Sequence, residues 1–233
     1  MREATKGHMS NAQSHQVLTE HESKKILEEN GFRVTKMTVA KTREEAVQAA
    51  KSIGFPVALK IVSPDIIHKT DANGVRLELS SVVDVERAFD EIVGAARSYN
   101  PDARIEGVGV QEFVSDGIEV IVGSKRDETF GPVVIFGLGG IFVDLFEDVS
   151  MRIVPFTELD IREMIREIKG YKILQGHRYA KKADIPALIE LISKTESLVD
   201  RDRRIVEMDL NPVKLLEEGK GAIVVDARIM RER

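Results

Sequence analysis

The sequence predicts an α+β protein built of two lobes, and three observations predict this class. Its 233 residues are enough for one large domain or two small lobes. The segment 39–112 follows the order strand–helix–strand–strand–helix–strand, which is sufficient for a small α+β lobe. The strands and helices that follow make a second sheet with its own helices. Small-molecule sites often lie between two such units, so we expect a binding site there.

The first half of the chain divides into a tail, an N-terminal helix and the small lobe. Residues 1–16 are polar and are expected to be a disordered tail. A capping box at Thr19 opens a helix that should end near Gly31, and a strand is expected at 33–39. We expect 17–38 to pack on the large lobe. The small lobe, 39–111, should contain a helix at 42–53, strands at 57–62 and 75–79, a helix at 81–97 and a strand at 107–114.

The large lobe is expected at 112–233. The turn chemistry of Ser115-Asp116-Gly117 favours a hairpin between the strand at 107–114 and one at 118–124. A strand at 205–210 should end at Pro212 and pair with a last strand at 222–229. The other elements expected in this lobe are strands at 133–136 and 149–154 and helices at 157–169 and 184–199.

Composition excludes several classes of function. The net charge of −5 and the pI of about 5.7 do not indicate a nucleic-acid partner. With no cysteine, the chain has no disulfide framework, Cys–zinc site or thiol nucleophile, which fits a reducing cytoplasm. Its longest apolar run, 131–143, contains Gly and Pro and is too short to cross a membrane.

Lys60 is the first candidate binding residue. It stands at the end of the apolar stretch 57–60, where an ammonium group can meet a polyphosphate as a compact cation with three donors. Taken alone, a lysine in this position more often simply extends to solvent.

Two later strands offer further contacts for a nucleotide. The backbone of Glu112, Phe113 and Val114 can present a carbonyl and an N–H to an adenine edge, and Glu119 can accept hydrogen bonds from ribose hydroxyls. The alternative is that Glu112 and Glu119 are ordinary carboxylates of two strands and bind no ligand.

An acidic strand provides candidate magnesium ligands. The period of two in a strand puts Asp209 and Asn211 on one face, while Met208 and Leu210 face the core. If the last two strands pair, Asp226 comes near Asn211 and Asp209. Oxygen ligands of this kind suit Mg²⁺ bound together with nucleotide phosphates. A polar strand face exposed to solvent remains the alternative.

His68 lies in the polar loop that follows Lys60. A neutral imidazole nitrogen can accept a phosphoryl group when the donor is in line and a cation shields the charge. Lys69 and a bound Mg²⁺ would supply that shielding. A surface histidine without a function is the simpler interpretation when no other residue is considered.

Together these residues resemble an ATP-grasp domain, and more closely the beta subunits of ADP-forming acetyl-CoA synthetases. The motifs that carry the resemblance span nearly all of the chain after residue 16, and the stretch around His68 is the most specific. They are GFPVALKIVSPDIIHKTDANGV at 54–75, VQEFV at 110–114, GLGGIFVDLFED at 137–148, EMDLNPV at 207–213 and VVDARI at 224–229.

The resemblance implies two lobes clasping ATP or ADP with Mg²⁺. Lys60 would contact the phosphates, 112–114 the adenine and Glu119 the ribose. Asn211 and Asp226 would hold Mg²⁺. His68 would relay a phosphoryl group with Asp209 orienting or stabilising it.

The resemblance also implies a CoA-binding alpha subunit as partner, in an α2β2 heterotetramer. The substrates would be acyl-CoA, phosphate and ADP. Two other functions stay open: an ATP-grasp carboxylate ligase that forms an acyl phosphate without phosphohistidine, and a non-catalytic nucleotide-binding regulatory subunit.

Overall fold

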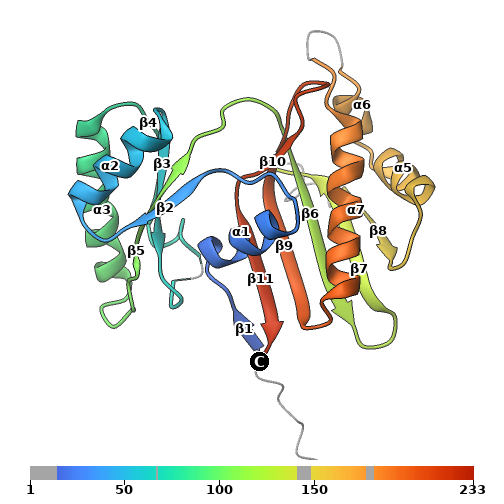
Figure 1. Ribbon diagram of the computed structural model, residues 1–233, viewed down its shortest axis with the longest axis horizontal. Helices are drawn as coiled ribbons and strands as arrows, with labels where there is room; N and C mark the ends of the chain where they lie inside the picture. The colour runs from blue at the N-terminus through green and yellow to red at the C-terminus, as the bar shows by residue number, and fades with distance from the viewer. Residues whose placement is uncertain (1–14, 67, 141–147, 177–180) are drawn as a thin grey trace, which may run out of the picture.

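The computed structural model describes residues 15–66, 68–140, 148–176 and 181–233. Within these ranges the chain forms two antiparallel sheets, one of four and one of seven strands. Figure 1 shows the sheets side by side, with helix α1 (Glu20–Glu29) between them and the other helices on the outer sides. Within these same ranges, the helices are all too short or too polar to span a membrane.

The four-stranded sheet has the order β2-β5-β3-β4 and is covered by two helices. Its core forms because β3 alternates: Leu59 and Ile61 point toward α2 and α3, where they meet Val85 and Ile92. Side-chain caps fix the starts of both helices. The bounds are β2 (Met37–Ala40), α2 (Arg43–Ile53), β3 (Val57–Val62), β4 (Val75–Leu79), α3 (Val82–Tyr99) and β5 (Gly107–Glu112).

The seven-stranded sheet has the order β1-β11-β9-β6-β7-β8, with β10 also paired to β9. Met208 and Leu210 of β9 join the core under α5 and α7, as the alternation of the sequence predicts. The bounds are β1 (His15–Val17), β6 (Ile118–Asp127), β7 (Gly131–Leu138), β8 (Val149–Ile153), α5 (Glu158–Glu167), α6 (Tyr171–Leu174), α7 (Ile185–Arg201), β9 (Ile205–Leu215), β10 (Ala222–Val224) and β11 (Ala227–Glu232).

The N-terminal segment joins both sheets. The capping box between Thr19 and Glu22 forms as predicted. Residues 1–14 of the expected tail lie outside the described residues, but the tail does not extend to residue 16, because His15–Val17 pairs with β11. The strand expected at 33–39 starts only at Met37 and pairs with β5 in the smaller sheet. The residues before it contact the larger sheet, because Arg33 and Thr35 exchange backbone hydrogen bonds with Val224 of β10.

Three expectations for the second half were wrong. Ser115-Asp116-Gly117 is not a hairpin turn: β5 pairs with β2 and β3, whereas β6 pairs with β7 and β9. The chain crosses between the sheets there. Pro212 does not end β9, because it lies at a bulge where the β6 register shifts and needs no N–H for the ladder. The strand expected at 222–229 is split into β10 and β11.

Candidate functional site

A cavity of about 720 Å³ lies between the two sheets. Strands β3, β5, β6, β9 and the break between β10 and β11 contribute to its wall, as does the start of α1. All the site residues predicted from the sequence line it, although they are spread from residue 60 to residue 226. They are Lys60, His68, Glu112, Phe113, Val114, Glu119, Asp209, Asn211 and Asp226.

Lys60 is buried in this cavity and does not extend to solvent. The residue is 6% exposed and lies in a strand that is paired on both sides, with Val75 and with Gly109. Its Nζ lies 3.0 Å from Oε1 of Glu20 and 2.9 Å from Oδ2 of Asp226. Burial acts to lower the pKa of the ammonium group, but the two carboxylates outweigh burial and raise it. Lys60 therefore stays a cation at the wall of the cavity.

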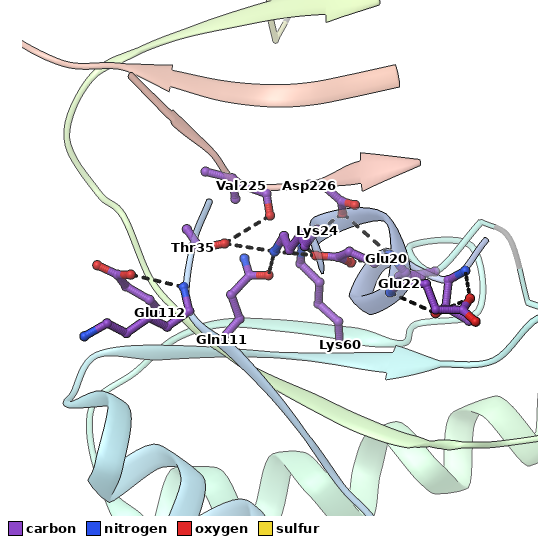
Figure 2. A network of polar contacts seen from close by, with 12 residues as sticks. Glu20, Glu22, Lys24, Thr35, Lys60, Gln111, Glu112, Val225 and Asp226 are labelled. Carbon is purple, nitrogen blue, oxygen red and sulfur yellow. Dashed lines mark hydrogen bonds and ion pairs between the residues drawn. The ribbon is translucent and has the colours of Figure 1, made fainter. Parts of the chain in front are cut away.

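Glu20 is a site residue that the sequence analysis missed. Its side chain is 2% exposed, and its carboxylate accepts hydrogen bonds from the ammonium groups of three lysines. Figure 2 shows Glu20 beside two of them, Lys24 and Lys60. The distances from its oxygens are 2.9 Å to Lys24, 3.0 Å to Lys60 and 2.5 Å to Lys69. Burial opposes ionisation, but the three lysines hold the pKa of the Glu20 carboxyl well below its usual range. The only sequence signal was an acid and a lysine four positions apart, which resembles an ordinary surface pair.

Lys24 connects α1 to the smaller sheet. Its Nζ donates to Oγ1 of Thr35 at 2.9 Å and to the side chain of Gln111 in β5, in addition to Glu20 (Figure 2). Burial lowers the pKa of this ammonium group to about 8, although Glu20 acts in the opposite direction. The three contacts hold the start of α1 against the cavity wall.

Asp209, Asn211 and Asp226 come together as the predicted strand pairing requires. The N–H of Asn211 donates to the carbonyl of Asp226 at 3.2 Å, and Arg228 pairs with Asp209 in the register of β9 and β11. Burial raises the pKa of the Asp209 carboxyl, and the neighbouring Arg228 offsets this only in part. The β9 bulge therefore places polar side chains of two strands on the cavity.

The side-chain oxygens of Asn211 and Asp226 fit a magnesium site in which a bound ligand supplies the other oxygens, rather than a site formed by the protein alone. Among the described residues no group of three or more His, Cys, Asp or Glu is arranged to hold a metal. Asn211 and Asp226 offer one amide and one carboxylate oxygen donor, and Mg²⁺ usually takes one or two such ligands together with phosphates. Oδ2 of Asp226 contacts Lys60 and lies 3.6 Å from Lys69, so a metal there would compete with these lysines.

The crossing segment after β5 forms another wall. Glu112 is fixed by Lys36, whose N–H donates to its carboxylate at 3.3 Å, and the N–H of Phe113 donates to the carbonyl of Pro56 at 3.4 Å. Glu119 pairs with Lys214 at 3.1 Å, and its carbonyl accepts from the N–H of Gly139 at 2.7 Å. The carboxylate of Glu119 is thus held at the β6–β9 side of the cavity.

His68 is exposed at the edge of the cavity. Its carbonyl accepts from the N–H of Ala72 at 3.3 Å, and the carbonyl of Lys69 accepts from the N–H of Gly74 at 2.8 Å. The side chain of Lys69 turns inward to Glu20. The imidazole is therefore accessible to a second molecule, while the neighbouring Lys69 is bound to the buried Glu20 carboxylate.

Comparison with known proteins agrees with this geometry. A family model described as an ATP-grasp domain matches residues 10–230. The beta subunit of acetate–CoA ligase (ADP-forming) II of Pyrococcus furiosus is 46% identical over 94% of this chain and 93% of its own length. Other relatives, 41% to 46% identical, are longer chains of which this chain spans 30%.

Two solved structures of acetyl-coenzyme A synthetase 1 of Candidatus Korarchaeum cryptofilum are similar. One, in complex with coenzyme A and Ca-AMPCP, has a TM-score of 0.89 at 46% identity and covers 94% of both chains. The other, with coenzyme A, Mg-AMPPCP and a phosphohistidine segment pointing towards the nucleotide site, has a TM-score of 0.81 at 42% identity, over 94% of this chain and 93% of that one. The chain therefore belongs to the ATP-grasp family, among the beta subunits of ADP-forming acetate–CoA ligases.

Proposed function

We propose that this chain is the nucleotide-binding subunit of an ADP-forming acyl-CoA synthetase, acetyl-CoA being the expected substrate. The complete reaction converts acyl-CoA, ADP and phosphate into the free acid, ATP and CoA. The observation that carries the proposal is the contact between the buried Lys60 and Asp226 in the cavity between the sheets. A cation and an oxygen ligand held there are what a magnesium–nucleotide complex requires.

The lobes 39–111 and 112–233 would close on ADP from two sides. Lys60 would contact its phosphates and Glu119 its ribose, while 112–114 would line the adenine. Asn211 and Asp226 would hold Mg²⁺, which neutralises phosphate charge when bound.

His68 would transfer the phosphoryl group. Its neutral imidazole takes the group from a phosphohistidine of the partner: the donor's P–N bond breaks as a new P–N bond forms. In the second step the P–N bond on His68 breaks, and an oxygen of the ADP β-phosphate forms the P–O bond of ATP. Asp209 would orient the imidazole. The chain supplies position and charge neutralisation, the main terms in phosphoryl transfer.

The partner would be a CoA-binding alpha subunit. The similar proteins of Pyrococcus furiosus are named as beta subunits, which supports a partner alpha subunit. We propose an α2β2 assembly acting in the cytoplasm, where ADP and acyl-CoA are available. Co-purification of the chain with a CoA-binding protein, followed by an acyl-CoA-dependent ATP-formation assay, tests the partnership.

Radioactive labelling tests the relay. Incubation with ATP labelled at the γ-phosphate should give an acid-labile, base-stable label that is lost in His68→Asn. Full turnover by His68→Asn with its partner would refute the relay and favour a carboxylate ligase without phosphohistidine. A chain without Mg²⁺-dependent ADP binding in calorimetry would refute the catalytic function altogether.

A further inference from the structure

Glu20 lies behind the phosphate-facing lysines and has no part in the function proposed so far. We infer that Glu20 is a positioning residue: its buried carboxylate holds the ammonium groups of Lys60 and Lys69 in place for phosphoryl transfer. The inference rests on the proposed function, because these two lysines matter for transfer only if phosphates bind beside them.

The hydrogen bonds from the three lysines are divided between the two oxygens of the Glu20 carboxylate. Oε1 accepts from Lys24 at 2.9 Å and from Lys60 at 3.0 Å, whereas Oε2 accepts from Lys69 at 2.5 Å. A carboxylate is rigid, so these contacts set the spacing between the Lys60 and Lys69 ammonium groups. Lys69 directly follows His68, and Glu20 therefore also restrains the loop that carries the imidazole.

Asp226 cannot take over this role when a nucleotide is bound. Its Oδ2 contacts Lys60 at 2.9 Å, but its side chain is 28% exposed and we propose it as a magnesium ligand. An oxygen committed to the metal is no longer free to hold both lysines. Glu20, with a side chain 2% exposed, keeps its contacts at the back of the cavity.

The contacts of the cluster explain what removing Glu20 should do. Three ammonium groups face two carboxylates; the members are Glu20, Lys24, Lys60, Lys69 and Asp226. Glu20 contacts all three ammonium groups, at 2.9 Å from Lys24, 3.0 Å from Lys60 and 2.5 Å from Lys69. Without this carboxylate the like charges repel one another, and the Lys60 and Lys69 ammonium groups lose their fixed spacing. Binding of phosphates should then weaken, because the lysines are no longer held in position.

Calorimetric titration of the full chain with ADP and Mg²⁺ tests this inference in Glu20→Gln, with Glu28→Gln as the matched control. Glu28 is on the same helix and exposed. Losing one charge-assisted contact should weaken ADP binding by about ten- to a hundredfold in Glu20→Gln. The control should stay within about twofold of wild type.

A double-mutant cycle separates positioning from general support of the fold. If Glu20 acts in part through Lys60, the combined loss of ADP affinity in Glu20→Gln with Lys60→Met should be clearly smaller than the sum of the two single losses. Independent, additive losses, or a Glu20→Gln affinity equal to that of wild type, would overturn the inference.

If Glu20→Gln does not fold, the ADP affinity of Glu20→Asp tests the inference instead. It keeps the charge but withdraws it by one methylene, so the lysines are no longer held at the same spacing and ADP binding should weaken. Unchanged affinity in Glu20→Asp would overturn the inference. Failure of wild type itself to bind ADP would instead refute the proposed function, so the two failures can be told apart.

Discussion

Replacing Lys60 with methionine tests the centre of the site, because methionine keeps the apolar stem and removes the charge. A hydrogen bond to a charged group contributes about 1.5–3 kcal/mol, which corresponds to roughly ten- to 150-fold in affinity. We therefore expect Lys60→Met to bind Mg²⁺–ADP weaker by about that factor. Calorimetric titration measures the change, and Lys51→Met, at an exposed position of α2, is the control.

The same substitution should cost less stability than a buried charge normally does. Removing one partner of a buried ion pair typically costs about 3–5 kcal/mol because the other charge is left alone. In Lys60→Met, Glu20 keeps its ion pairs with Lys24 and Lys69. Asp226 is partly exposed, so water can solvate its carboxylate. We expect a loss of about 1–3 kcal/mol in urea unfolding. If Lys60→Met folds normally and its ADP affinity is within about twofold of wild type, the phosphate role of Lys60 is refuted.

Three further predictions concern acidic residues. Asp226→Asn should raise the Mg²⁺ concentration that supports ADP binding by about tenfold or more; an unchanged midpoint in a Mg²⁺ titration would contradict its ligand role. Asp148→Ala should lower the free energy of unfolding by about 3 kcal/mol. The reason is that the buried carboxylate accepts hydrogen bonds from the N–H groups of Lys169 at 2.6 Å and Gly170 at 2.7 Å. A loss below about 1 kcal/mol in urea unfolding would be inconsistent with this role. Asp209→Asn should be more stable than wild type at neutral pH, since burial raises the pKa of the Asp209 carboxyl and disfavours its ionised form. This gain should vanish in unfolding curves at acid pH, where the Asp209 carboxyl of wild type is protonated in both the folded and the unfolded state.

Local patterns were enough to predict many of the elements. The alternation along β9 and the capping box at Thr19 depend on neighbouring residues, and both appear in the structure as predicted. The turn at Ser115-Asp116-Gly117 has good hairpin chemistry, but which sheet each flanking strand joins depends on distant partners. A local pattern carries no information about such pairings.

The site shows the same limit. The predicted residues do line one cavity, because the resemblance supplied long-range information that single residues lack. Glu20 escaped prediction because its burial results from α1 packing against β11 and from the contact with Lys60 of β3, 40 residues further along the chain. A glutamate in the first turn of a helix normally indicates a favourable interaction with the helix dipole, and nothing in its neighbours distinguishes a buried case.

The pairing of β1 with β11 brings the two ends of the described chain next to each other. His15 lies opposite Glu232, so the described chain starts and finishes at one edge of the seven-stranded sheet (Figure 1). A short linker can join these two points, and new ends can be opened at a turn such as that of Gly219, where nothing approaches within 4 Å of an added Cβ. Circularly permuted chains should keep the cavity intact. The site should therefore depend on how the segments pack together and not on the order in which the chain connects them.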